Sequence, residues 1–290
     1  ISCRNTNVLR LVNTVLALIF FGGVVSLFAI IACKGGIDFS DMGPAFATAG
    51  VAKYHSPLMQ IVNVLVLAPW AFVGFGVVSF ASSTYDFKPK YGFAIMATAL
   101  ATGAIVYALI ALLSVSANPA GSGNWETYFA NLQNFKGIDA VPAFHAIFNS
   151  LGNGGLIVLA ITITAAISTS LLGLYRTIGR MFLSLAEDSV MPSWFGHINR
   201  HGATNYGIIY VMLLSCIIPF FGRTAIGWIV DITSISASII YLYVSAGIVK
   251  IARSETGRQK TVLNFTGILG VVISAFFFFF PLTPTLWNMN

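Results

Sequence analysis

Charged residues are scarce in this sequence. Charged residues make up 8% of its 290 residues, and acidic residues are the rarer kind, nine against fifteen basic ones. A soluble domain carries about 25% charged residues, because its surface has to stay in water. The composition therefore excludes a soluble protein.

Cysteine is scarce as well. The three cysteines are Cys3, Cys33 and Cys216, and no spacing among them is typical of a metal centre or a disulfide framework. The first two lie at opposite ends of one apolar segment, so they cannot pair with each other. We expect free, mostly buried thiols and no metal.

Long apolar segments are what the sequence has in abundance. A helix needs about 20 apolar residues to cross the hydrocarbon core of a bilayer, and its backbone groups have to bond within the segment. Alternating apolar and polar segments, which would predict a transmembrane β-barrel, do not occur. We predict an all-α polytopic membrane protein, one transmembrane domain over 1–290, with seven spans near 11–33, 57–82, 91–116, 155–186, 205–221, 225–250 and 262–280.

The basic residues are unevenly divided between the connections. With the spans threaded alternately, eleven Lys and Arg fall on the side of the N-terminus and four on the other side. The positive-inside rule then places the N-terminus in the cytoplasm, and we expect the plasma (cell inner) membrane. Topology accounts for the net charge of +6, so we expect a lipid bilayer and no nucleic acid as partner.

The connections at 34–56 and 117–154 are the two long ones, and the second has a clear internal pattern. It holds two short amphipathic stretches, "NWETYFANLQNF" and "VPAFHAIFNSL", before "GNGG" at 152–155. Loops of this length usually carry structure of their own. We expect two short helices on the outer side and a hinge at the glycines.

One predicted span has weak helix formers at its middle. Pro69, Gly74 and Gly76 lie within "PWAFVGFG" at 69–76. Such a break survives at membrane depth only where protein or a water-filled cavity satisfies the freed backbone groups, as in the binding sites of secondary transporters. A kinked structural helix is the alternative interpretation, since Gly and Pro are common in membrane helices.

Three motifs resemble one transporter family in their order along the chain. "PWAFVGFG" resembles the discontinuous sixth helix of the amino acid–polyamine–organocation (APC) superfamily. "RTIGRMFLSLAEDSVMPSWFGHIN" at 176–199 resembles its eighth helix, with Gly179, Glu187 and Ser189 replacing the usual residues, and "IVDITSISASIIYLYVSAGIVKIAR" at 229–253 resembles its tenth helix.

The resemblance implies the leucine-transporter fold, built from inverted repeats. The chain would then hold helices five to eleven of an amino acid permease. The N-terminal helices of the same chain would be missing, which agrees with a sequence that begins at Ile1 and ends abruptly.

The resemblance also implies a substrate site at the break. Trp70 matches an aromatic lid, and the substrate-binding residues would be Trp70, Phe72, Gly74, Phe75 and Gly76. Gly74 lets the backbone approach a ligand, because it has no side chain. The acidic residues that many relatives carry after this motif are absent, which disfavours a cationic substrate.

Two further positions are candidates for ion binding and gating. Ser168, Thr169 and Ser170 match the hydroxyls that hold sodium in some relatives, although hydroxyls also bond back to their own helix. The segment 11–33 lacks the lysine of proton-coupled relatives, which favours coupling to Na⁺, or no coupling ion, over coupling to H⁺, and we expect no cofactor. Asp231 is a candidate gate, or an ion-pair partner of Arg223.

We therefore expect a secondary active transporter for an amino acid or related small amine. A truncated permease half that acts as a structural or interaction module is an alternative. A membrane-embedded enzyme is the other, but it would need a nucleophile with a base or several carboxylates at one depth, and the spans hold one Asp and no His. His197 and His201 have ligand spacing without a third ligand, so we expect a solvated loop and no zinc site.

Overall fold

The computed structural model describes residues 6–37, 42–48, 56–80, 88, 90–117, 123–200 and 204–282. Its described elements are α-helices and short 3₁₀ turns, without a strand among them, so the protein is an all-α polytopic membrane protein. The chain divides into two compact units. Unit 1 comprises residues 1–47 and 74–216, and unit 2 comprises residues 48–73 and 217–290.

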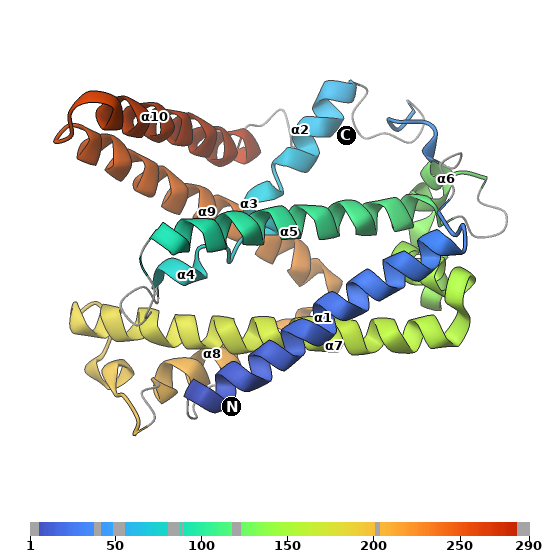
Figure 1. Cartoon of the computed structure of the whole chain (residues 1–290), viewed down its shortest axis with the longest axis horizontal. Helices are drawn as coiled ribbons and strands as arrows, with labels where there is room; N and C mark the ends of the chain where they lie inside the picture. Colours follow the sequence, from blue (N-terminus) through green and yellow to red (C-terminus); the bar gives the residue numbers. More distant parts are fainter. Residues whose placement is uncertain are drawn as a thin grey trace. The chain divides into compact units, whose positions relative to one another are not determined.

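Unit 1 is built on a long helix, α7 (Pro142–Glu187), against which α1 (Thr6–Cys33) and α5 (Lys90–Val115) pack (Figure 1). Its smaller elements are α4 (Val77–Phe80), α6 (Trp125–Ala130), α8 (Asn205–Ile217), and the 3₁₀ turns η3 (Leu132–Asn134), η4 (Gly137–Ala140) and η5 (Ser193–Gly196).

Glycines bring α1 and α7 into close contact. A Cβ built on Gly23 would lie 2.0 Å from the hydroxyl oxygen of Thr162, and one built on Gly36 would lie 2.6 Å from that of Ser150. Small residues allow helix backbones to approach in a membrane, where apolar side chains gain nothing by leaving lipid. Gly23 lies on α1, and Gly36 follows just after α1 ends but meets an earlier residue of α7, so the two helices are antiparallel.

The helix α7 is two helices joined at a kink. Gly152 has φ 60° and ψ −151°, outside the helical region, and glycine adopts a positive φ without a steric penalty. This confirms the hinge expected at "GNGG". The kink separates the first helix, 142–151, from the long span that follows.

The residues before this kink form a separate layer, which we call the cap: residues 124–151, comprising α6, η3, η4 and the first helix of α7. Tyr128, Ala146 and Ile147 of the cap share a buried core with Ile31 of α1 and Leu113 of α5. The expected pair of short helices in this connection is therefore present, and it is anchored on two spans.

Unit 2 is built on the hairpin of α9 (Arg223–Ala252) and α10 (Gly257–Phe279). Its other elements are α2 (Pro57–Leu65), α3 (Ala68–Ala71), and the 3₁₀ turns η6 (Ile218–Phe221) and η7 (Phe280–Leu282). Gly270 lies against Ser245 and Gly267 against Val249, so small residues again set the approach of the two helices.

Five helices in the described residues are long and apolar enough to cross a membrane, and they begin at Val8, Lys90, Pro142, Ala225 and Gly257. The two other predicted spans differ. The segment from 57 is broken into short pieces, and the segment from 205 is a shorter apolar helix that continues into η6.

The prediction about the cysteines is partly wrong. Cys33 and Cys216 are free, as expected, but both are exposed on the surface of the chain rather than buried. Cys3 lies outside the described residues.

Candidate functional site

The helix predicted over 57–82 is interrupted at two places in the residues that the structure describes. Helix α2 ends at Leu65, α3 covers only Ala68–Ala71, and α4 begins at Val77. The interruption after Ala71 lies where the sequence predicts it. The interruption at Val66 and Leu67 comes earlier than predicted.

Pro69 explains the earlier interruption. A proline has no backbone N–H, and its ring clashes with the carbonyl four residues earlier, which here belongs to Leu65, the last residue of α2. Pro69 instead lies in the first turn of α3, where its missing N–H costs nothing. One residue thus ends one helix and starts the next.

Residues 72–76 form a run of turns between α3 and α4. The amide of Val73 donates to Trp70 O at 3.1 Å and that of Val77 donates to Gly74 O at 3.1 Å, so bonds to the third residue back replace helical ones. Gly74 has φ +103°, a conformation that residues with a side chain rarely adopt. The turn therefore depends on glycine at this position.

Each side of the break packs against a different helix. In unit 2, α3 packs against α9, and in unit 1, α4 packs against α7. The division between the two units falls between Val73 and Gly74. The break is therefore also the place where the chain passes from one unit to the other.

The predicted substrate-binding residues lie on both sides of this division. In unit 2, Trp70 is 37% exposed, beside the buried Pro69, and Phe72 directly follows the last residue of α3. In unit 1, Phe75 is partly buried, and the carbonyl of Gly76 accepts two bonds from Ser79, from its amide at 2.9 Å and its hydroxyl at 2.6 Å.

The three predicted ion-binding hydroxyls lie in the span of α7. Thr169 donates its hydroxyl hydrogen to the side-chain oxygen of Asn13 on α1. Other threonines of α7 bond back within the helix: Thr162 donates to Val158 O at 2.7 Å. Back-bonding therefore does not describe Thr169. Sequence reasoning missed Asn13, although an Asn inside an apolar segment was the available signal.

The structure shows no ion pair or metal site at the remaining candidates that it describes, Asp231 and His197. Asp231 is exposed on α9, and the side chain of Arg223, its suggested ion-pair partner, lies outside the described part of the chain. His197 is exposed with its ring 5.6 Å from that of Tyr206, and His201 lies outside the described residues. Within those residues, no group of three His, Cys, Asp or Glu could hold a metal ion.

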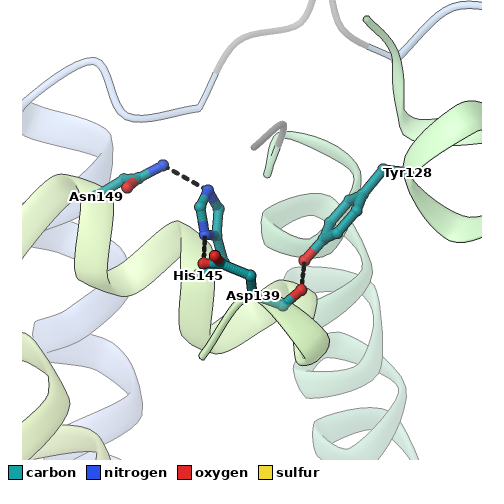
Figure 2. A network of polar contacts seen from close by, with 4 residues as sticks. All are labelled: Tyr128, Asp139, His145 and Asn149. Carbon is teal, nitrogen blue, oxygen red and sulfur yellow. Dashed lines mark hydrogen bonds and ion pairs between the residues drawn. The ribbon is translucent and has the colours of Figure 1, made fainter. Parts of the chain in front are cut away.

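A polar network in the cap was not predicted from the sequence. Figure 2 shows the ring of His145 between the side chains of Asp139 and Asn149, with Tyr128 on the far side of Asp139. The signal was the four-residue spacing of His145 and Asn149, which places both side chains on one helix face.

Comparison with known proteins identifies the family. The sequence profile described as amino acid permease matches residues 1–289. The chain belongs to the amino acid permease family. No curated protein and no solved structure matches it.

Membership has two direct consequences. The chain is an integral membrane protein of a family of amino acid transporters, which confirms the resemblance to APC superfamily permeases. It also points to a transporter rather than an enzyme, in keeping with the sequence interpretation.

Proposed function

We propose that this permease is a secondary active transporter that carries an amino acid or related small amine by alternating access. Its substrate binds at the broken helix, around residues 70–76. The observation that carries this proposal is the interruption of an apolar segment, in a permease chain, by turns that require glycine at Gly74.

A broken helix supports the proposal because of the polar groups it provides. Amide and carbonyl groups that leave the helical pattern can bind the carboxylate and ammonium groups of an amino acid. Gly74 and Gly76 have no atom within 4 Å of a built Cβ, so space surrounds the backbone here. Trp70, partly exposed, is the proposed lid.

The same proposal assigns roles on α7 and α9. Ser168, Thr169 and Ser170 form a candidate cation site, and Asp231 is a candidate gate. The oxygen of Thr169 still has lone pairs for a cation, because its hydrogen points to Asn13. Sodium is the favoured coupling ion, since helix α1 has no lysine within 11–33.

The arrangement around the site follows from the family resemblance. We propose a leucine-transporter-type fold in which this chain supplies helices five to eleven, helices from the N-terminal part of the full protein complete the site, and the whole forms one transmembrane domain. The charge asymmetry supports a cytoplasmic N-terminus for this segment and a plasma-membrane location.

Transport by the full-length protein in proteoliposomes tests the proposal. A panel of labelled amino acids is offered to vesicles, and uptake of the transported one is then measured with unlabelled substrate trapped inside. Alternating access predicts that label enters vesicles preloaded with unlabelled substrate faster than it enters empty vesicles. A channel would show no such acceleration, and no uptake of any amino acid or amine would reject the transporter.

Two variants test where the substrate binds. Gly74→Leu should abolish uptake while the protein still inserts, because it places apolar bulk where backbone meets a polar ligand. Gly92→Leu controls for added apolar bulk, because Gly92 in α5 also has no atom within 4 Å of a built Cβ. Gly74→Ala controls for backbone strain, because it places a Cβ at φ +103° with little bulk, and it should retain uptake. Trp70→Ala should weaken apparent affinity and retain some uptake. Normal uptake by Gly74→Leu would show that the substrate does not bind at the broken helix.

A further inference from the structure

The ring of His145 is the centre of a polar network on the cap. Its Nδ1 lies 2.7 Å from the Asp139 carboxylate oxygen, and its Nε2 lies 2.8 Å from Nδ2 of Asn149 (Figure 2). The residue is 7% exposed. Both ring nitrogens are therefore engaged although the ring is almost buried.

The partners determine how the hydrogens are arranged. An ionised carboxylate only accepts, so Nδ1 of His145 carries a hydrogen and donates it to Asp139. The amide nitrogen of Asn149 donates to Nε2, which therefore has a free electron pair and no hydrogen. In this state the ring is neutral and both of its nitrogens have a hydrogen-bond partner.

The network can also hold the charged ring. A proton added at Nε2 of His145 would face the amide hydrogens of Asn149. Rotation of the Asn149 side-chain amide by 180° places its oxygen there instead, and this oxygen accepts the new N–H. Asn149 is exposed, so this turn needs no space in the core and water reaches the site. The Asp139 side chain, 50% exposed, supplies the opposite charge at small desolvation cost.

Tyr128 keeps the carboxylate segment in place in both states. Its hydroxyl donates to the backbone oxygen of Asp139 at 2.6 Å, and its side chain is fully buried. Burial, and then the charge of Asp139, raise the pKa of Tyr128 above its ordinary value. The phenol therefore remains a donor while a histidine titrates.

The rest of the surroundings contributes few charges. The cap rests on apolar residues of α1 and α5. The other titratable side chains of the described elements packed here are Glu126, buried on α6, Lys136, exposed between η3 and η4, and Cys33 and Lys34 at the end of α1. Lys34 is engaged, since its Nζ donates to Ser150 O at 3.4 Å.

We propose that His145 is a proton-binding switch through which the pH on the cap's side of the membrane sets how firmly η4 is tied to the first helix of α7. Protonation adds a positive charge to the donor of the bond that the Asp139 carboxylate already accepts, so the contact becomes an ion pair and gains the attraction between opposite charges. The Asp139–His145 contact lies just before the kink at Gly152. At low pH the cap residues that precede this kink therefore become more rigid. The inference goes beyond the proposed transport function and does not depend on it.

Hydrogen–deuterium exchange of the full-length protein in nanodiscs tests the switch. After correction for intrinsic exchange rates, amides of residues 137–149 should exchange roughly two- to fivefold more slowly at about pH 6 than at about pH 8, which is the range expected for the added attraction of a partly exposed ion pair. Equal protection at the two pH values in the wild type would overturn the proposal.

Two substitutions should remove the pH response in opposite ways. His145→Gln cannot take up a proton, so the cap should show the weaker protection at both pH values. Asn149→Asp offers Nε2 an acceptor only, which favours the charged ring, so protection should be strong at both. A wild-type response in either variant contradicts the switch. His197→Gln, which alters an exposed histidine outside the cap, is the matched control and should respond as the wild type does.

Discussion

Thr169 on α7 donates its hydroxyl hydrogen to the side-chain oxygen of Asn13 on α1. The bond joins two apolar helices of unit 1 at the position where the sequence predicts a cation site. Interhelical hydrogen bonds of this kind contribute about 0.6 kcal/mol on average to membrane proteins. The bond also directs the hydroxyl hydrogen of Thr169 toward Asn13, which leaves the lone pairs of the hydroxyl oxygen for the proposed cation.

The first prediction separates an ion-binding role of Thr169 from a packing role. Thr169→Val removes the hydroxyl and nearly keeps the shape, so sodium-dependent uptake should be lost if the oxygen holds sodium. Thr169→Ser should retain it. Uptake of labelled amino acid is measured with sodium and with choline in its place.

Asn13→Leu is the control for that experiment. It removes the interhelical bond but leaves the Thr169 hydroxyl, which can turn to its own helix as Thr162 does. The sodium response should therefore survive in Asn13→Leu. If it loses sodium dependence just as Thr169→Val does, the pair acts through helix packing and the cation site is rejected.

The second prediction concerns backbone strain in the break. Gly74→Ala should lower the stability of the protein by about 1–3 kcal/mol, because φ +103° is costly for a residue with a Cβ. Gly76→Ala, two residues on and without a positive φ, should leave stability nearly unchanged. Thermal unfolding in one detergent compares the variants. Equal melting temperatures would mean that the turn at Gly74 is absent in the membrane.

The sequence predicts the uninterrupted helices well, and the reason is physical. Apolar segments near 20 residues have one stable solution in lipid, so α5 at Lys90–Val115 differs from the predicted 91–116 by one residue at each end. The second interruption, at Val66, was missed because proline's effect reaches back to the carbonyl four residues earlier. The long α7 begins before its predicted start because the cap helix runs directly into the kink at Gly152.

The third prediction tests the orientation of the chain. In a background without native cysteines, Lys136→Cys in the cap should react with an impermeant maleimide on intact cells. Thr256→Cys, between α9 and α10, should react only after permeabilisation. Both positions are exposed. The reverse pattern would overturn the inference drawn from the basic residues.

Side-chain pairs between helices could not be predicted. The spacing within "STS" at 168–170 indicates hydroxyls at one depth, but the partner of Thr169 depends on how α1 and α7 slide past each other. The cap network could not be predicted either. Asp139 contacts His145, and Tyr128 contacts Asp139, only after η4 and α6 fold onto α7. Local pattern identifies such residues as unusual, and tertiary contacts decide what they bind.

The last prediction tests the register of α1 against α7. A Cβ on Gly23 would lie 2.0 Å from Thr162 Oγ1, and Thr162 is buried with its hydroxyl bonded to Val158 O. Gly23→Ala should therefore destabilise the protein by about 1–3 kcal/mol, as overpacking does. Gly22→Ala meets nothing within 4 Å and should be neutral or slightly stabilising, since Ala favours a helix over Gly.

A second substitution, at Thr162, tests whether the effect of Gly23→Ala comes from this contact. Thr162→Ala removes the two atoms at 2.0 and 3.0 Å and leaves the Cβ at 2.9 Å, so the double variant with Gly23→Ala should be more stable than the sum of the single changes by about 1 kcal/mol. Melting temperatures of the four proteins in one detergent give the coupling. Additive effects would show that Gly23 and Thr162 do not face each other. The Asn13–Thr169 bond would then fail as well, because the same antiparallel register places both pairs in contact.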